Sequence, residues 1–193
     1  MSMFNLQNLL PAWVDDFLQT EAARFPDVEA RMAFVIRLAR HNVENGSGGP
    51  FGAAVFERDS GLLVAVGVNA VITSRCSHAH AEMVALALAQ QQLGTHDLAS
   101  PGLPPHQLVT SCEPCAMCLG AIPWSGVKHV VCGALDEDAR AIGFDEGAKP
   151  ANWQAELEAR GIKVQTGVHR AEAVAVLQRY VAANGMIYNA HSD

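Results

Sequence analysis

Residues 110–118, TSCEPCAMC, take the chain from a predicted strand into a helix that carries Cys115 and Cys118 on successive turns. The earlier stretch 77–82, SHAHAE, starts a second predicted helix and contains His80. One imidazole and two thiolates are ligands that zinc prefers, and three protein ligands leave the fourth tetrahedral position for water. An open position allows chemistry at the metal. The two stretches therefore predict a catalytic zinc site around which the chain is organised.

An acid and two further candidate ligands lie close to these stretches. Glu82 follows His80 by two residues, too near it on a helix to be a fourth ligand but close enough to exchange protons with water at the metal. A Cys-x-x-Cys pair alone is also typical of structural zinc sites, redox pairs and buried thiols. Cys112 could close the site as a fourth ligand, but Glu82 would then have no role. His78 has no acid two residues after it, so we leave it outside the metal shell.

Length and composition favour one domain. The chain has 193 residues, and half of them are apolar, which suits a single sizeable core. We expect residues 1–26 to form an N-terminal accessory segment. Residues 27–193 then form one domain that ends in a C-terminal helical segment.

Charge and cysteine content restrict the function classes. The net charge is -7, with only 13 lysines and arginines spread over the chain, so binding to nucleic acid is not expected. No apolar run is long enough to cross a membrane, and the N-terminus does not resemble a secretory signal. Five cysteines, an odd number, fit a reducing compartment better than a disulfide framework. We therefore expect a cytoplasmic protein.

Hydrophobic periodicity and turn residues indicate an alternation of strands and helices. The predicted elements are a helix beginning after a cap at Asp27, strands at 51–56 and 62–68 joined by a turn at 59–61, a helix at 80–91, strands at 107–111 and 127–132, a helix at 153–160, a strand at 162–165, and a last helix bearing Val174, Leu177 and Val181. This order predicts an α/β fold with a central sheet covered on both faces.

Two local features complete this pattern. Pro114 is suited to the first position of the cysteine helix, whose N-terminus would stabilise nearby thiolates. Residues 133–152 read as one irregular stretch, too long for an ordinary connection, and we expect it to have a functional role.

The combination of His-x-Glu at 80–82 with Pro-Cys-x-x-Cys at 114–118 resembles the cytidine deaminase-like superfamily of zinc-dependent nucleobase deaminases. The resemblance covers about residues 27–190. It implies a three-layer α/β/α sandwich with a central mixed sheet of about five strands. It also implies one zinc per chain and hydrolytic loss of ammonia, with Glu82 as the proton carrier.

Within this superfamily, residues 110–124 and 141–147 are most similar to bacterial guanine deaminases. The similarity implies that guanine is converted to xanthine and ammonia, and it extends to guanine-like aminotriazines. It further implies that Glu146 is a second proton shuttle. Without the resemblance, Glu146 would be interpreted as a solvated loop acid, like the neighbouring Asp136, Glu137 and Asp138.

The resemblance also suggests where the substrate and a second subunit bind. It implies substrate contacts from Asn69, Ala81, Trp124, Phe144 and Tyr188. Taken alone, the asparagine is typical of a turn, and the aromatic residues are equally typical of a core. Guanine deaminases of this type are dimers, so we expect a homodimer in which residues 186–189 contribute to the partner's site.

Alternatives from other classes stay open on the sequence. A tRNA adenosine deaminase shares the zinc motifs but should have a basic surface, which this acidic chain lacks. Deamination of cytosine or of a nucleoside is a further enzyme alternative. A non-catalytic binding module stabilised by zinc should show four protein ligands.

Overall fold

The computed structural model describes residues 10–189. Its elements, in chain order, are α1 (Trp13–Gln19), α2 (Val28–Glu44), β1 (Gly52–Glu57), β2 (Leu63–Val68), α3 (Val71–Ser74), α4 (Ala81–Leu93), β3 (His106–Cys112), α5 (Ala116–Ser125), β4 (His129–Ala134), α6 (Asp136–Ala141), α7 (Trp153–Glu158), β5 (Lys163–Gln165) and α8 (Arg170–Ala182).

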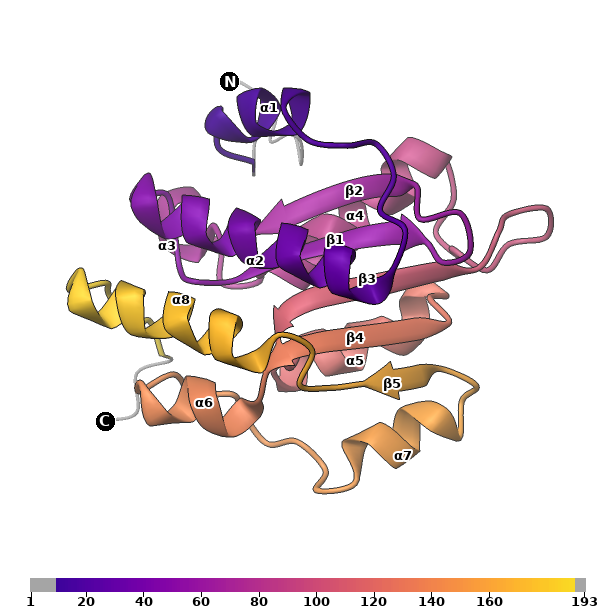
Figure 1. Cartoon of the computed structure of the whole chain (residues 1–193). Helices are drawn as coiled ribbons and strands as arrows, with labels where there is room; N and C mark the ends of the chain where they lie inside the picture. The colour runs from indigo at the N-terminus through magenta and orange to yellow at the C-terminus, as the bar shows by residue number, and fades with distance from the viewer. Residues whose placement is uncertain (1–9, 190–193) are drawn as a thin grey trace.

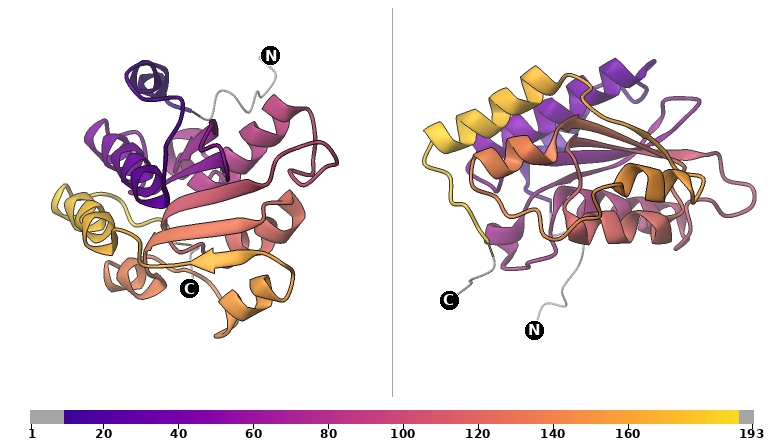
Figure 2. Two further views of the ribbon diagram at one scale, coloured as in Figure 1. Left: turned by 45° about the vertical axis from the view of Figure 1, so that its right-hand side comes forward. Right: turned by 90° about the horizontal axis from the view of Figure 1, so that it is seen from below.

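The five strands form one mixed sheet in the order β2-β1-β3-β4-β5 (Figure 1). Strand β1 runs antiparallel to β2 and β3, whereas β3, β4 and β5 are parallel. Helices α2, α6 and α8 cover one face, and α4, α5 and α7 cover the other (Figure 2). The predicted three-layer α/β/α sandwich with five strands is therefore confirmed.

Strand β1 shows why the predicted strands read as continuous apolar runs. Successive side chains point to opposite faces of a sheet, so a strand that is covered on both faces needs apolar residues at every position. Ala54 and Phe56 pack in the core on the α2 side. Ala53 and Val55 pack in the core on the α4 side.

Two individual residues explain how helices α2 and α4 are placed beside the sheet. The Asp27 side chain accepts a hydrogen bond from the Ala30 N–H, so the predicted cap of α2 is confirmed. Gly67 on β2 lies directly against α4, and a Cβ atom there would be only 2.1 Å from the Ala81 carbonyl oxygen. Glycine at this position allows the first turn of α4 to lie close to the sheet.

Three expectations about the later half of the chain were wrong. The stretch 133–152 is not irregular throughout, because it contains α6. Asp138 in α6 is not a solvated loop acid, since it accepts a hydrogen bond from Leu135 N and pairs with Arg170. Pro114 does not open the cysteine helix, because Cys115 is the N-cap and α5 begins at the next residue.

The described part of the N-terminal segment packs against the domain. Trp13 stacks on His41 of α2, with 5.7 Å between the ring centroids, and Phe17 of α1 contacts Phe34. The boundary after residue 26 stays a prediction, because α1 shares this core cluster with α2. Over residues 10–189, no helix has the length and apolar character needed to cross a membrane.

Candidate active site

The candidate site lies at the carboxyl ends of strands β2, β3 and β4. These three strands run in the same direction, so their carboxyl ends meet at one edge. In open α/β sheets, ligands bind beside such an edge. Helices α4 and α5 both begin there, so their N-termini bring His80 and Cys115 together.

The three predicted metal ligands converge. His80 Nδ1 lies 3.4 Å from Cys115 Sγ and 3.7 Å from Cys118 Sγ, and the ligand atoms of all three residues lie within 4.8 Å of one another. A tetrahedral zinc, with bonds of about 2.1 Å to nitrogen and about 2.3 Å to sulfur, separates two such ligand atoms by about 3.6 Å. The spacing and the chemistry of the donors therefore fit zinc.

The surroundings of Cys115 favour the thiolate form of this one ligand. Hydrogen bonding with Cys118 and then with His80 lowers the pKa of Cys115 to about 4, against the effect of its burial. Zinc binds the thiolate form of cysteine, so a low pKa prepares this ligand.

The alternative ligands do not join this cluster. Cys112 is buried in the core on the α2 side of the sheet, and its thiol lies 3.7 Å from the Leu135 carbonyl oxygen. His78 instead contacts Cys76. Among the described residues, only one group of histidine, cysteine or acidic side chains is spaced to hold a metal ion. It has three members, His80, Cys115 and Cys118. The geometry therefore favours an open site over a closed four-ligand site.

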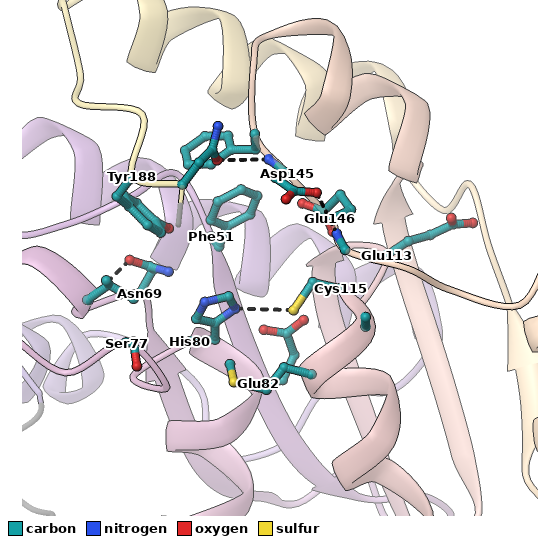
Figure 3. A pocket seen from close by; sticks show the side chains of 16 residues that line it. Phe51, Asn69, Ser77, His80, Glu82, Glu113, Cys115, Asp145, Glu146 and Tyr188 are labelled. Atoms are coloured by element: carbon teal, nitrogen blue, oxygen red, sulfur yellow. Dashed lines mark hydrogen bonds between the residues drawn. The ribbon is translucent and has the colours of Figure 1, made fainter. Parts of the chain in front are cut away.

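Glu82 is buried beside the cluster, in the first turn of α4. Its carboxyl group lies between His80 and Cys115 in the view of Figure 3, and its side chain lines the cavity. Burial raises the pKa of Glu82 to about 7, and the negative charge of Cys115 adds to this rise. A carboxyl group in this environment can both accept and donate a proton near neutral pH.

Glu146 reaches the same cavity from the segment that follows α6. It is only 6% exposed, and its backbone carbonyl accepts a hydrogen bond of 2.8 Å from Ala116 N, at the start of α5. Gly147 has a φ of +72°, and a Cβ atom there would lie 2.9 Å from Ala116 Cβ, so glycine allows the close approach. Burial raises the pKa of Glu146 to about 8, with a further contribution from Cys115.

A cavity of about 470 Å³ opens in front of these groups, and Figure 3 shows the side chains that line it. Phe144 contributes an apolar wall, with its ring 5.0 Å from Phe51 and 5.1 Å from Tyr188. The hydroxyl group of Tyr188 is buried and, among the described residues, has no hydrogen-bond partner. A buried polar atom without a partner is costly, so this hydroxyl group is suited to bind a ligand.

Asn69 follows β2 and lines the same cavity. Its Oδ1 accepts hydrogen bonds from Gly49 N and Val71 N, and these bonds fix the orientation of the amide group. The Nδ2 donor is buried and finds no partner within residues 10–189. The asparagine therefore offers a fixed donor, which a turn residue would not need.

Two residues that were expected to contact the substrate, Trp124 and Ala81, do not line this cavity in the single chain. Trp124 is 85% exposed and borders a separate cavity beside α7. It follows Cys115 by nine residues, roughly 180° around a helix axis, so the two side chains point in opposite directions. The side chain of Ala81 does not line the cavity either, because it is buried in the core between the sheet and α4.

The sequence interpretation assigned no role to Glu113 and considered Asn189 only as part of the segment 186–189. Glu113 lies inside the cysteine motif, lines the cavity and accepts a hydrogen bond of 3.1 Å from Asp136 N. Asn189 clasps the segment before Glu146, because it accepts from Asp145 N and donates to the Gly143 carbonyl. Only the position of Glu113 within the motif could have indicated a role.

Several known proteins are similar to this chain. A family model described as the cytidine and deoxycytidylate deaminase zinc-binding region matches residues 26–134. The guanine deaminase of Bacillus subtilis is 43% identical over 111 residues, which cover 58% of this chain and 67% of that protein. A solved structure of guanine deaminase from Nitrosomonas europaea is 54% identical, with a TM-score of 0.85, and covers 90% of this chain and 94% of the other. A solved complex with 2,6-diaminopurine is 55% identical, with a TM-score of 0.87, and covers 93% of this chain and 94% of that one.

Proposed function

Because the chain belongs to the cytidine and deoxycytidylate deaminase zinc-binding family, we propose that it is a guanine deaminase, which converts guanine and water to xanthine and ammonia. One observation carries the proposal. Two buried acids, Glu82 and Glu146, line the cavity that also contains the metal ligands. Guanine-like aminotriazines have the same amine between two ring nitrogens and are included in the proposed substrate class.

The metal ligands are His80, Cys115 and Cys118. Zinc bound there supplies Lewis acidity that lowers the pKa of water toward neutrality. The residues around it must then move protons and hold the base.

Glu82 is proposed to carry the first proton. Hydrolysis forms a bond from the water oxygen to the ring carbon that bears the amine, and the adjacent ring nitrogen must gain a proton. Glu82 accepts a proton from the attacking water and donates it to that nitrogen. Its buried carboxyl group is suited to both roles.

Glu146 is proposed to assist the second half of the reaction. The carbon–nitrogen bond to the exocyclic amine breaks, and the amine must gain a proton to leave as ammonia. In guanine this amine lies between two ring nitrogens, so a second acid on the other side of the base can share the proton transfers. Glu146 enters the cavity from a different element than Glu82, as this arrangement requires.

The remaining cavity residues are proposed to orient the planar base. Phe144 provides an apolar surface, and Asn69 Nδ2 and Tyr188 OH provide the free polar atoms. A base that satisfies these atoms and exposes its amine to both acids would be held in position for the reaction.

The alternatives fit less well. The net charge of -7 disfavours tRNA, because binding to a polynucleotide needs clustered positive charge. A structural zinc site should have a fourth protein ligand, and the described residues place none beside the other three.

We also propose a cytoplasmic homodimer. Five free cysteines support a reducing compartment. The resemblance to dimeric guanine deaminases supports a second subunit whose residues 186–189 help to close the site. In the single chain, Tyr188 and Asn189 line the cavity of their own chain, so an exchange between subunits would preserve the same contacts.

A substrate panel tests the proposal. The zinc-loaded protein is given guanine, cytosine, cytidine, adenosine and tRNA, and ammonia release is measured, with Glu82→Gln as the inactive control. Guanine should be the preferred substrate. Ammonia release from tRNA with none from guanine would overturn the proposal in favour of a tRNA adenosine deaminase.

A further inference from the structure

Lys149 is a buried cation close to the active site that the reaction described above does not use. Its side chain is only 7% exposed, although lysine is among the residues that are rarely buried. Lys149 is not among the residues that line the cavity, so we do not expect it to contact the substrate. A buried ammonium group is costly unless it is paired, so its surroundings should explain why it is there.

The ammonium group connects three segments that are distant in the sequence. Lys149 Nζ donates a hydrogen bond of 3.0 Å to the carbonyl oxygen of Pro114, the residue just before Cys115. It also forms an ion pair with Asp136, the first residue of α6. Because Lys149 follows Glu146 by three residues, this one side chain connects the segment carrying the second acid to the cysteine loop and to α6.

Other contacts of Asp136 reinforce the same arrangement. Its backbone N–H donates to the Glu113 carboxyl group, and its carboxyl group accepts a hydrogen bond of 2.5 Å from Arg140. Arg140 in turn donates to the Gly147 carbonyl, at 2.9 Å. The charge of Lys149 is therefore balanced within a network that encloses the segment between α6 and α7.

We infer that Lys149 is a positioning residue for the second acid, holding the segment that carries Glu146 at a fixed distance from the Cys115 end of α5. The inference rests on the proposed function, because positioning affects the rate only if Glu146 takes part in proton transfer. The contact that fixes this distance is the 2.8 Å hydrogen bond from Ala116 N, at the start of α5, to the Glu146 carbonyl. Small displacements of a reacting group can lower a rate by roughly 100-fold, so holding the Glu146 segment in place should increase the rate of the reaction.

The test is a double-mutant cycle of Lys149→Met with Glu146→Gln, measured with guanine. Methionine keeps the length and the apolar part of the side chain but removes the charge. Lys149→Met alone should lower kcat at least about tenfold, while KM changes less than about threefold and zinc content is unchanged. In the Glu146→Gln background, the same change should lower kcat by less than about twofold. The matched control is Lys163→Met, because that lysine is exposed on β5.

A second readout does not depend on activity. The Ala116 amide should exchange its hydrogen at least about tenfold faster in Lys149→Met than in the parent or in Lys163→Met, because its acceptor is no longer held. If Lys149→Met does not fold, Asp136→Asn breaks the ion pair from its more exposed end and should show the same dependence on Glu146.

The outcomes separate the two proposals. An equal loss of kcat in both Glu146 backgrounds, or unchanged exchange at Ala116, would overturn the positioning role of Lys149. A parent protein that releases no ammonia from guanine would overturn the proposed function, and amide exchange would still decide whether Lys149 holds the segment.

Discussion

Replacing Glu146 by glutamine separates its chemistry from its structural role. The anchor of this segment on α5 is the backbone carbonyl of Glu146, which accepts from Ala116 N, and a change of side chain leaves it in place. Within residues 10–189, no protein hydrogen bond to the Glu146 carboxyl group is found. Glutamine has nearly the same shape, so the variant should fold and should keep its zinc. Proton transfer is then the property that is lost.

The expected size follows from the position of the carboxyl group. Positioned proton transfer contributes roughly 100- to 10,000-fold to a rate. Glu82 lines the same cavity and carries part of the proton traffic, so the lower end of this range applies. Glu146 is only 6% exposed, so bulk water has little access to replace it. We therefore expect turnover of guanine to fall by at least about 100-fold, which corresponds to about 2.7 kcal/mol in the barrier.

The assay is steady-state ammonia release from guanine, with zinc content measured for each variant. Glu137→Gln is the matched control, because this glutamate lies in the same part of the chain and its side chain is 72% exposed. Asp138 is less suitable, since its side chain is only 14% exposed and accepts a hydrogen bond from Leu135 N at the start of α6. Turnover of Glu146→Gln close to that of Glu137→Gln would refute the second acid and weaken the guanine assignment.

Further predictions concern the first acid, the metal ligands and the stability of the fold. Glu82→Gln should fold and keep its zinc but lose roughly 100- to 10,000-fold in activity, and turnover within about tenfold of the parent would remove it from the proton-transfer role. Cys115→Ala should lose its zinc, whereas Cys112→Ala should retain about one zinc per chain by metal analysis; the opposite pattern would mean that the wrong thiolate was assigned. Hydrogen bonding to Arg170 lowers the pKa of Asp138, so its stabilising contribution is present at neutral pH and is lost as the pH falls below about 4. Urea unfolding of Asp138→Asn should therefore show lower stability than the parent at pH 7 and a smaller difference at acid pH, and a constant difference would contradict this account.

The sequence alone predicted the layers of the fold and the candidate metal ligands, which the structure brings together. Strands that are apolar at nearly every position indicate a sheet covered on both faces, because each side chain of such a strand faces one of two buried layers. The spacing of Cys115 and Cys118, with Glu82 placed just after His80, is a local property of two helix starts. The spacing between neighbouring residues in the sequence does not depend on the tertiary structure, so these residues could be identified from the sequence.

Only the tertiary structure decided which residues from distant segments share the cavity. Trp124 lies within the cysteine motif that carries the resemblance, yet the phase of α5 turns it away from the site. Glu146 and Lys149 lie in a segment without regular structure, where no periodicity predicts the direction of a side chain. Their placement depends on contacts with α5 and α6 that form only when the chain is folded. Buried charges find their partners through space rather than along the sequence, so this network could not be predicted from the sequence alone.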